Sequence, residues 1–280
     1  MSRSVLSWMV LVAVFCLAGL VALAQPVDRP RRPVEVLDLD TLRSDLFSRS
    51  LRDLRPLEDY LEGHIPGSHH LDWRPLEEAV LASPGPAMDK VAEALGDHKL
   101  IPGQVLALYD TSLLGRADGW AAWLLTYGGL KPVEVFDGGF AAWNRHRRLG
   151  VYSGYSMPQG RRTLQAQHLN PQPDLRVDPS TLAEGIPEGS ALLVVDPEGE
   201  GEPPAGHVRA SEFLDTKGQY LFPYHLGLLL EARGIDPEAR LIIQGEHLNA
   251  GLVWTALVAN GFQAAMVVPL IEDTAAKQVP

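Results

Sequence analysis

Two hydrophobic patterns alternate along most of the chain. The continuous apolar run at residues 105–109 is typical of a buried parallel strand, and residues 133–136 are predicted to form the next strand. Between them, residues 120–127 carry large apolar side chains at i, i+3, i+4 and i+7, which is one face of a helix. A second helix, carrying Trp143, follows the turn Asp137-Gly138-Gly139. Strands that alternate with helices predict an α/β fold with a parallel sheet covered on both faces.

The same order of elements recurs in the second half. The apolar run 191–195 ends in Asp196, and His207 follows this aspartate by eleven residues, as His64 follows Asp53. Residues 241–243 form another buried-strand run, and after a six-residue polar loop a helix leads from Ala250 towards Gly261. Equal spacings in the same element order predict a duplicated α/β domain.

The first 24 residues have the pattern of a secretory signal peptide. Arg3 is followed by an almost wholly apolar stretch, 5–23, and Ala22-Leu23-Ala24 places small residues before a cleavage site. The apolar stretch is close to the roughly 20 residues that span a bilayer, so an uncleaved anchor is the alternative. We therefore expect an extracytoplasmic body, periplasmic in a Gram-negative source, or anchored to the inner membrane and facing the periplasm.

Composition shifts suggest the remaining boundaries. We predict a Pro- and Arg-rich tether at 25–35, a first domain at 36–157, a linker at 158–174, a degenerate second domain at 175–272 and a tail at 273–280.

Charge and cysteine content narrow the functional classes. The chain has 35 acidic and 24 basic residues, a net charge of -11 that argues against nucleic acid as a partner. Its single cysteine, Cys16, lies in the predicted leader. A mature body without cysteine can form no disulfide, thiolate zinc site, iron–sulfur cluster or cysteine nucleophile.

Two motifs stand out in the first half. The first is Asp53-Leu54-Arg55 with Tyr60 and the run 63–68 (Gly-His-Ile-Pro-Gly-Ser), and the second is Tyr109-Asp110 with Asp137-Gly138-Gly139-Phe140. Together they resemble the opening and closing motifs of the rhodanese-like sulfurtransferases, in particular the tandem thiosulfate and 3-mercaptopyruvate sulfurtransferases. In the second half, residues 206–210 retain only the Gly-His pair of the opening motif. The resemblance covers about residues 36–270 and implies two rhodanese-like domains.

The resemblance also implies a catalytic cysteine after the central strand, where backbone N–H groups stabilise its thiolate. Aligning Ala117 and Ala250 with the start of the family helix puts Asp110 at the nucleophile position of the first domain. In the second domain the position falls on Gln244, or on Gly245 if the loop slips by one. Neither side chain can carry a transferable sulfur, so a catalytically inactive member is the prediction.

Other chemistry is weakly supported. Asp110-Thr111-Ser112 lacks the second aspartate of an aspartyl-phosphate site, and no hydrolase triad is evident. His64 is interpreted as a turn histidine that bonds the backbone rather than as a metal ligand, and the tryptophans as core residues. We predict no metal and no cofactor.

The predicted binding residues follow from charge. Asp110 fills its own loop and pairs with Arg116, whereas neutral Gln244 leaves the second loop open to a small anion, with His247 aiding in mild acid. The candidate binding set is Gln244, Gly245, Glu246, His247, Asn249 and Arg116. We expect an exported binding or accessory module whose partner is a small anion or a sulfur-metabolism or redox protein, with membrane contact only if the leader is retained. A sulfurtransferase-like or other unidentified enzyme is the alternative.

Overall fold

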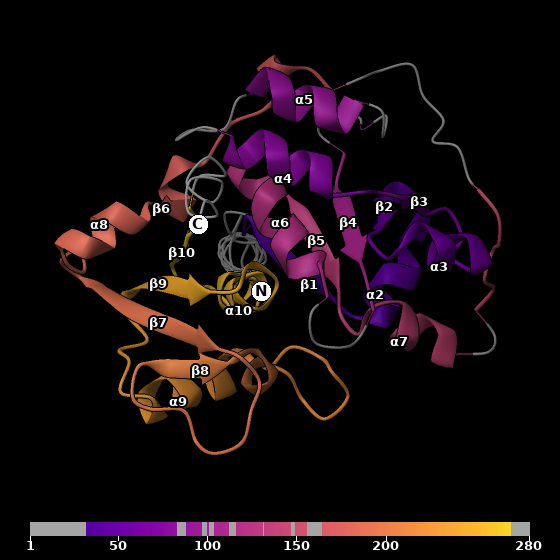
Figure 1. Cartoon of the computed structure of the whole chain (residues 1–280). Helices are drawn as coiled ribbons and strands as arrows, with labels where there is room; N and C mark the ends of the chain where they lie inside the picture. The colour runs from indigo at the N-terminus through magenta and orange to yellow at the C-terminus, as the bar shows by residue number, and fades with distance from the viewer. Residues whose placement is uncertain are drawn as a thin grey trace, which may run out of the picture. The chain divides into compact units, whose positions relative to one another are not determined.

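The structure, a computed structural model, describes residues 32–82, 88–96, 100, 104–111, 116–130, 132–146, 149–155 and 164–269 (Figure 1). The predicted leader, residues 25–31 of the predicted tether, Ser112 and the predicted tail lie outside these ranges. The described ranges all belong to one compact unit that starts at Arg32. Among the helices of these ranges, none combines the length and the apolar character needed to cross a membrane.

The first repeat is a five-stranded parallel sheet in the order β1-β5-β4-β2-β3 (Figure 1). Its strands are β1 (Val34–Leu37), β2 (Ser50–Asp53), β3 (His69–His70), β4 (Leu106–Tyr109) and β5 (Val133–Phe136). Its helices are α2 (Leu39–Ser44), the 3-10 helix η1 (Leu46–Ser48), α3 (Leu57–Glu62), α4 (Arg74–Leu81), α5 (Met88–Gly96), α6 (Asp118–Tyr127) and α7 (Gly139–Arg145).

The second repeat is another five-stranded parallel sheet, in the order β6-β10-β9-β7-β8. The chain reaches it through two 3-10 helices, η2 (Ala166–His168) and η3 (Pro173–Leu175). Its elements are β6 (Arg176–Val177), α8 (Pro179–Glu184), β7 (Ser190–Asp196), β8 (His207–Arg209), η4 (Ala210–Phe213), α9 (Pro223–Ala232), β9 (Arg240–Gly245), α10 (His247–Ala259) and β10 (Ala264–Val267). The two sheets share one strand order, in which β6, β10, β9, β7 and β8 correspond to β1, β5, β4, β2 and β3, and this supports the predicted duplication.

One histidine equivalence is wrong, although His64 and His207 follow their aspartates at the same spacing. His207 is the first residue of β8, and its Nδ1 lies 3.0 Å from Oδ1 of Asp196. His64 lies before β3 and bonds the carbonyl of Tyr60 instead. In the first repeat, part of the chain between Asp53 and His64 forms helix α3, and a helix advances only 1.5 Å per residue. In the second repeat, the described residues between Asp196 and His207 form no helix.

The alternation of side chains along the strands explains why both faces of the first sheet are covered. Leu106 and Leu108 of β4 point into the larger core under α4, α5 and α6, whereas Ala107 and Tyr109 point into a smaller core under α2 and α7. All four side chains are buried. The continuous apolar run therefore reflects a strand buried on both sides, as its sequence predicts.

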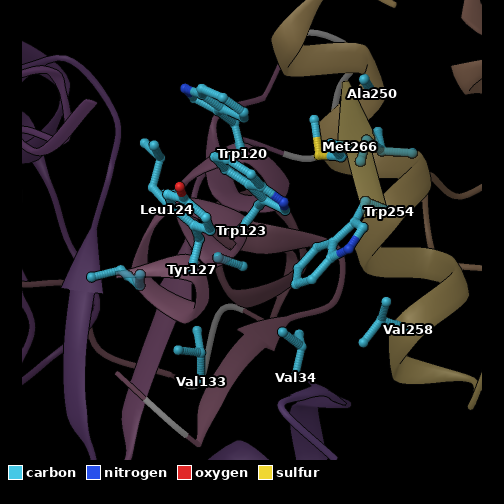
Figure 2. Close-up of a cluster of buried hydrophobic side chains, with 14 of the residues drawn as sticks. Val34, Trp120, Trp123, Leu124, Tyr127, Val133, Ala250, Trp254, Val258 and Met266 are labelled. Atoms are coloured by element: carbon cyan, nitrogen blue, oxygen red, sulfur yellow. The ribbon is translucent and has the colours of Figure 1, made fainter. Parts of the chain in front are cut away.

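A common core joins the two repeats through α6 and α10. Figure 2 shows Trp120, Trp123 and Tyr127 stacked along α6, with Trp254 of α10 beside them. The ring centroids of Trp120 and Trp123 are 5.0 Å apart, and those of Trp123 and Tyr127 are 4.9 Å apart. The prediction that these tryptophans are core residues is confirmed.

The two helices meet at glycines. A Cβ atom added at Gly119 of α6 would lie 2.6 Å from the carbonyl oxygen of Gly251 in α10. One added at Gly251 would lie 2.6 Å from Cα of Trp120. The hydroxyl of Thr255 completes the contact by donating to the carbonyl of Gly119 at 3.3 Å. The backbones of α6 and α10 are therefore in direct contact at the centre of the interface between the two repeats.

Candidate functional site

The opening motif of the first repeat forms a buried scaffold. Arg55 donates from Nε and Nη2 to the two carboxylate oxygens of Asp53, at 3.0 and 2.6 Å, and also to the carbonyl of Gly63 at 2.6 Å. The guanidinium carbon lies 3.8 Å from the centre of the Phe140 ring. Asp53 is fully buried, so this two-point ion pair fixes the end of β2 against the 63–68 turn and α7.

The histidine of this motif, His64, bonds the backbone. The Nδ1 atom of His64 is 2.9 Å from the carbonyl oxygen of Tyr60, and the two rings stack at 4.1 Å. Tyr109 adds a bond that sequence reasoning missed, because its hydroxyl lies 2.8 Å from Oγ of Ser68. The expectation that the imidazole of His64 bonds the backbone is confirmed, but His64 itself forms an antiparallel bridge with Tyr152 rather than a turn. Within the described ranges, no group of three or more His, Cys, Asp or Glu side chains is placed to hold a metal ion.

Asp110 follows β4 directly and fills the start of its own loop, as predicted. Its Oδ1 accepts the N–H of Thr111 at 2.7 Å, and its Oδ2 accepts the N–H of Ala117 at 2.5 Å. Burial raises the pKa of Asp110, and these two N–H bonds oppose the rise. The backbone of Gly139 crosses so close that an added Cβ would lie 2.2 Å from the carbonyl oxygen of Asp110, which explains the Gly-Gly pair of the closing motif.

Arg116 does not pair with Asp110, which corrects that prediction. Its Nε lies 3.0 Å from Oδ1 of Asp118, and both side chains are fully buried. Its Nη1 donates to the carbonyl of Gly218 at 3.3 Å, and its guanidinium carbon lies 4.4 Å from the ring centre of Tyr220. Burial raises the pKa of Asp118 to about 7 even with Arg116 beside it. Arg116 is therefore part of the contact between the first loop and the second repeat.

The second loop is shorter than predicted. Gln244 and Gly245 belong to β9, where they pair with Val194 and Val195 of β7, and α10 already begins at His247. Glu246 is the first residue beyond the strand. Its two carboxylate oxygens accept the N–H groups of Leu248 and Asn249 at 3.2 and 3.1 Å, an N-cap that lets the helix start three residues before Ala250.

The prediction of an open cradle in the second loop is therefore wrong. The place next to the strand is taken by Glu246 rather than by Gln244, and its carboxylate already satisfies the first N–H groups of the helix. The residues from Gln244 to His247 are exposed, and the ring of His247 lies 5.3 Å from that of Trp120 and 6.4 Å from that of Trp73. The candidate binding set is thus divided: five members lie where β9 ends and α10 begins, and Arg116 is buried beside Gly218 and Tyr220.

Comparison with known proteins agrees with this architecture. A family model described as rhodanese-like domain matches residues 38–146. The 3-mercaptopyruvate sulfurtransferase of Escherichia coli K12 is 26% identical over 141 residues, which are 49% of this chain and 47% of that protein. The first repeat thus contains a rhodanese-like domain, and the chain is similar to sulfurtransferases that carry this domain.

Two further rhodanese-like relatives extend the likeness to both repeats. SseB of Mycobacterium tuberculosis, named provisionally as a thiosulfate sulfurtransferase, is 27% identical over 230 residues, covering 74% of this chain and 78% of SseB. The crystal structure of the 3-mercaptopyruvate sulfurtransferase SseA from E. coli aligns with a TM-score of 0.65 at 20% identity, over 84% of this chain and 97% of SseA. The structural match supports the fold, while the E. coli sequence match spans about half the length of each protein.

Proposed function

We propose that this rhodanese-like protein is an exported binding or accessory module without sulfurtransferase activity. One observation carries the proposal: the residues that follow the two central strands, Asp110 and Glu246, are carboxylates engaged by backbone N–H groups, and the chain has no cysteine after Cys16. A carboxylate cannot hold a sulfane sulfur, so the persulfide step of the family has no acceptor atom.

The same observation favours a protein partner over a small anion. A free anion at either loop would have to displace a carboxylate that already accepts N–H bonds at 2.5–3.2 Å. The exposed residues from Gln244 to His247 instead offer a polar surface next to Trp73. A sulfur-metabolism or redox protein remains the partner class that the family suggests.

A sulfur-transfer assay tests the proposal. Purified exported protein is incubated with cyanide and either thiosulfate or 3-mercaptopyruvate, with the E. coli 3-mercaptopyruvate sulfurtransferase in parallel as the positive control. We expect thiocyanate formation at the rate of the buffer blank. Turnover that scales with the concentration of the pure protein would refute the inactive assignment.

The export part of the proposal has its own test. The small residues Ala22 and Ala24 predict cleavage after Ala24, so the intact mass of protein recovered from the exported fraction should correspond to residues 25–280. A mass that retains residues 1–24, together with recovery in the membrane fraction, would support the anchored alternative.

A further inference from the structure

A cavity of about 390 Å³ lies between the two repeats, next to the contact that Arg116 makes with Tyr220. Its lining includes Asp38 and Asp137, which follow β1 and β5 of the first repeat, and Asp215 of the second repeat. Arg32, Phe222 and Asn260 also line it. The cavity is thus built by both halves of the chain, and carboxylates dominate its charged lining.

Each carboxylate of the lining is fixed by the backbone of a turn. Oδ1 of Asp38 accepts a hydrogen bond from the backbone N–H of Thr41 at 2.7 Å. Oδ1 of Asp137 accepts one from the backbone N–H of Tyr220 at 3.1 Å. Oδ1 of Asp215 accepts the N–H groups of Lys217 and Gln219 at 2.7 and 2.9 Å. These bonds use one oxygen of each carboxylate and hold the three groups in place.

The electrostatics of the cavity favour a cation. Arg32 is the one basic residue of the lining, and its guanidinium donates to the carbonyl of Ala259 in the last turn of α10, where the helix dipole is negative. Among the described residues of the lining, three carboxylates therefore face one guanidinium, and the buried Arg116 lies behind Tyr220. Burial, with a further contribution from Asp215, raises the pKa of Asp137 to about 6, although the N–H bond from Tyr220 and the charge of Arg116 oppose the rise.

An exposed apolar face adjoins the cavity. Phe222, which lines the cavity, is 75% exposed, and Tyr224 and Leu228 of α9 are 72% and 46% exposed in the described part of the chain. Tyr224 and Leu228 are four residues apart and so lie on the same side of the helix. A surface helix normally turns polar residues outward, and clustered large apolar side chains on its outer side are typical of an interaction surface.

We propose that the acidic cavity and the Phe222–Tyr224–Leu228 face together form a docking site for a partner protein segment that carries an arginine or lysine next to a large apolar residue. The basic side chain enters the cavity between Asp137 and Asp215, and the apolar neighbour packs on Tyr224 and Leu228. Arg32 provides a precedent, because the chain itself already holds one guanidinium at this helix end. The inference deepens the proposed binding role and rests on it, yet peptide binding and sulfur transfer are separate measurements that can fail independently.

Two short peptides test the pairing of charge and apolar contact. The acetylated and amidated sequences Gly-Leu-Arg-Leu-Gly and Gly-Leu-Gln-Leu-Gly are titrated into the full protein at pH 7.5, with affinity followed by calorimetry. We expect the arginine peptide to bind with a Kd below about 1 mM and at least about tenfold more tightly than the glutamine peptide. Raising the salt concentration should reduce this difference.

Charge-neutral variants locate the site. Asp137→Asn and Asp215→Asn each keep the acceptor oxygen of their turn, so the fold is expected to be retained while affinity for the arginine peptide falls by roughly three- to tenfold. Asp178→Asn is the matched control, because Asp178 also accepts a turn N–H but lies outside the cavity lining. Tyr224→Ser should weaken the binding of both peptides, whereas Tyr152→Ser, which removes another exposed tyrosine, in the first repeat, should weaken neither.

Three results would overturn the proposal. The first is equal affinity for the two peptides, or no binding of the arginine peptide at about 1 mM. The second is an effect of Asp178→Asn as large as that of Asp137→Asn and Asp215→Asn, which would reduce the charge dependence to net charge. The third is self-association in sedimentation that Tyr224→Ser abolishes, because a second copy of the chain would then be the occupant of the apolar face.

Discussion

The close approach of α6 and α10 makes Gly119→Ala the most direct test of how the two repeats are joined. The added methyl carbon would lie 2.6 Å from the carbonyl oxygen of Gly251, about 0.8 Å inside the 3.4 Å at which ordinary contact begins. The obstacle is backbone, so no side-chain rotation relieves it, and the helices must move apart across the core that contains Trp120 and Trp254. Overpacking of this kind costs about 1–3 kcal/mol, against a gain of up to about 1 kcal/mol in helix propensity.

The net expectation is a loss of about 1 kcal/mol in the free energy of unfolding, or roughly 2–4 °C in Tm for a unit of this size. Differential scanning calorimetry and urea unfolding monitored by tryptophan fluorescence measure both quantities. Gly251→Ala should cost a similar amount, because its methyl would lie 2.6 Å from Cα of Trp120. The double variant should lose less than the sum of the two, since the helices need to separate only once.

Gly227→Ala is the matched control for this experiment. Gly227 also lies in a helix, α9, but nothing is within 4 Å of the position its Cβ would take. We expect this variant to gain roughly 0.5–1 kcal/mol from helix propensity alone. If Gly119→Ala proved as stable as Gly227→Ala, the backbone contact between α6 and α10 would not exist in solution, and the shared core of the two repeats would need revision.

Two further predictions concern buried charge. Arg55→Met leaves the carboxylate of Asp53 buried without its partner, so it should lower the free energy of unfolding in urea by about 3–5 kcal/mol. Arg74→Met removes an exposed ion pair and should cost less than about 1 kcal/mol. Equal effects of the two variants would contradict the burial argument. The folded-state pKa of Asp137 is raised to about 6, so the folded protein binds this proton more tightly than the unfolded chain does. The resulting contribution to stability is present below about pH 4 and is lost as the pH rises to 6. The stability difference between wild type and Asp137→Asn should therefore fall by up to about 2 kcal/mol over that interval, and a flat or rising difference would show the sign to be wrong.

The regular elements could be predicted from the sequence because buried positions carry apolar residues at regular spacings. The apolar run 105–109 contains β4, and the spacing of Trp120, Trp123 and Tyr127 predicts helix α6, which the structure buries on all sides. These signals are local: each depends on residues that are neighbours in sequence and share one environment.

Contacts between distant segments could not be predicted in the same way. Arg116 meets Gly218 across 102 positions, and nothing in the local pattern around Arg116 favours that partner over Asp110. The length of β9 was misjudged because Gln244 and Gly245 are polar and loop-like in composition, although Val194 and Val195 hold them in the sheet. Gly119 and Gly251 did carry a signal, since a glycine inside an otherwise apolar helix often marks a close approach.

The two carboxylates after the central strands would explain how the fold persists if the chain lacks sulfurtransferase activity, as proposed above. In a rhodanese-like loop the backbone N–H groups require an anionic acceptor, which a thiolate supplies at a cost, because a free cysteine has a pKa near 8.5 and must be held ionised. Asp110 and Glu246 supply the acceptor with a group that is ionised at neutral pH in water, and they bond N–H groups at 2.5–3.2 Å. Replacing the thiolate by a carboxylate therefore preserves the local stabilisation of each loop while removing the nucleophile. Selection for binding at other surfaces, such as the acidic cavity, can then act on a scaffold whose stability no longer depends on a reactive group.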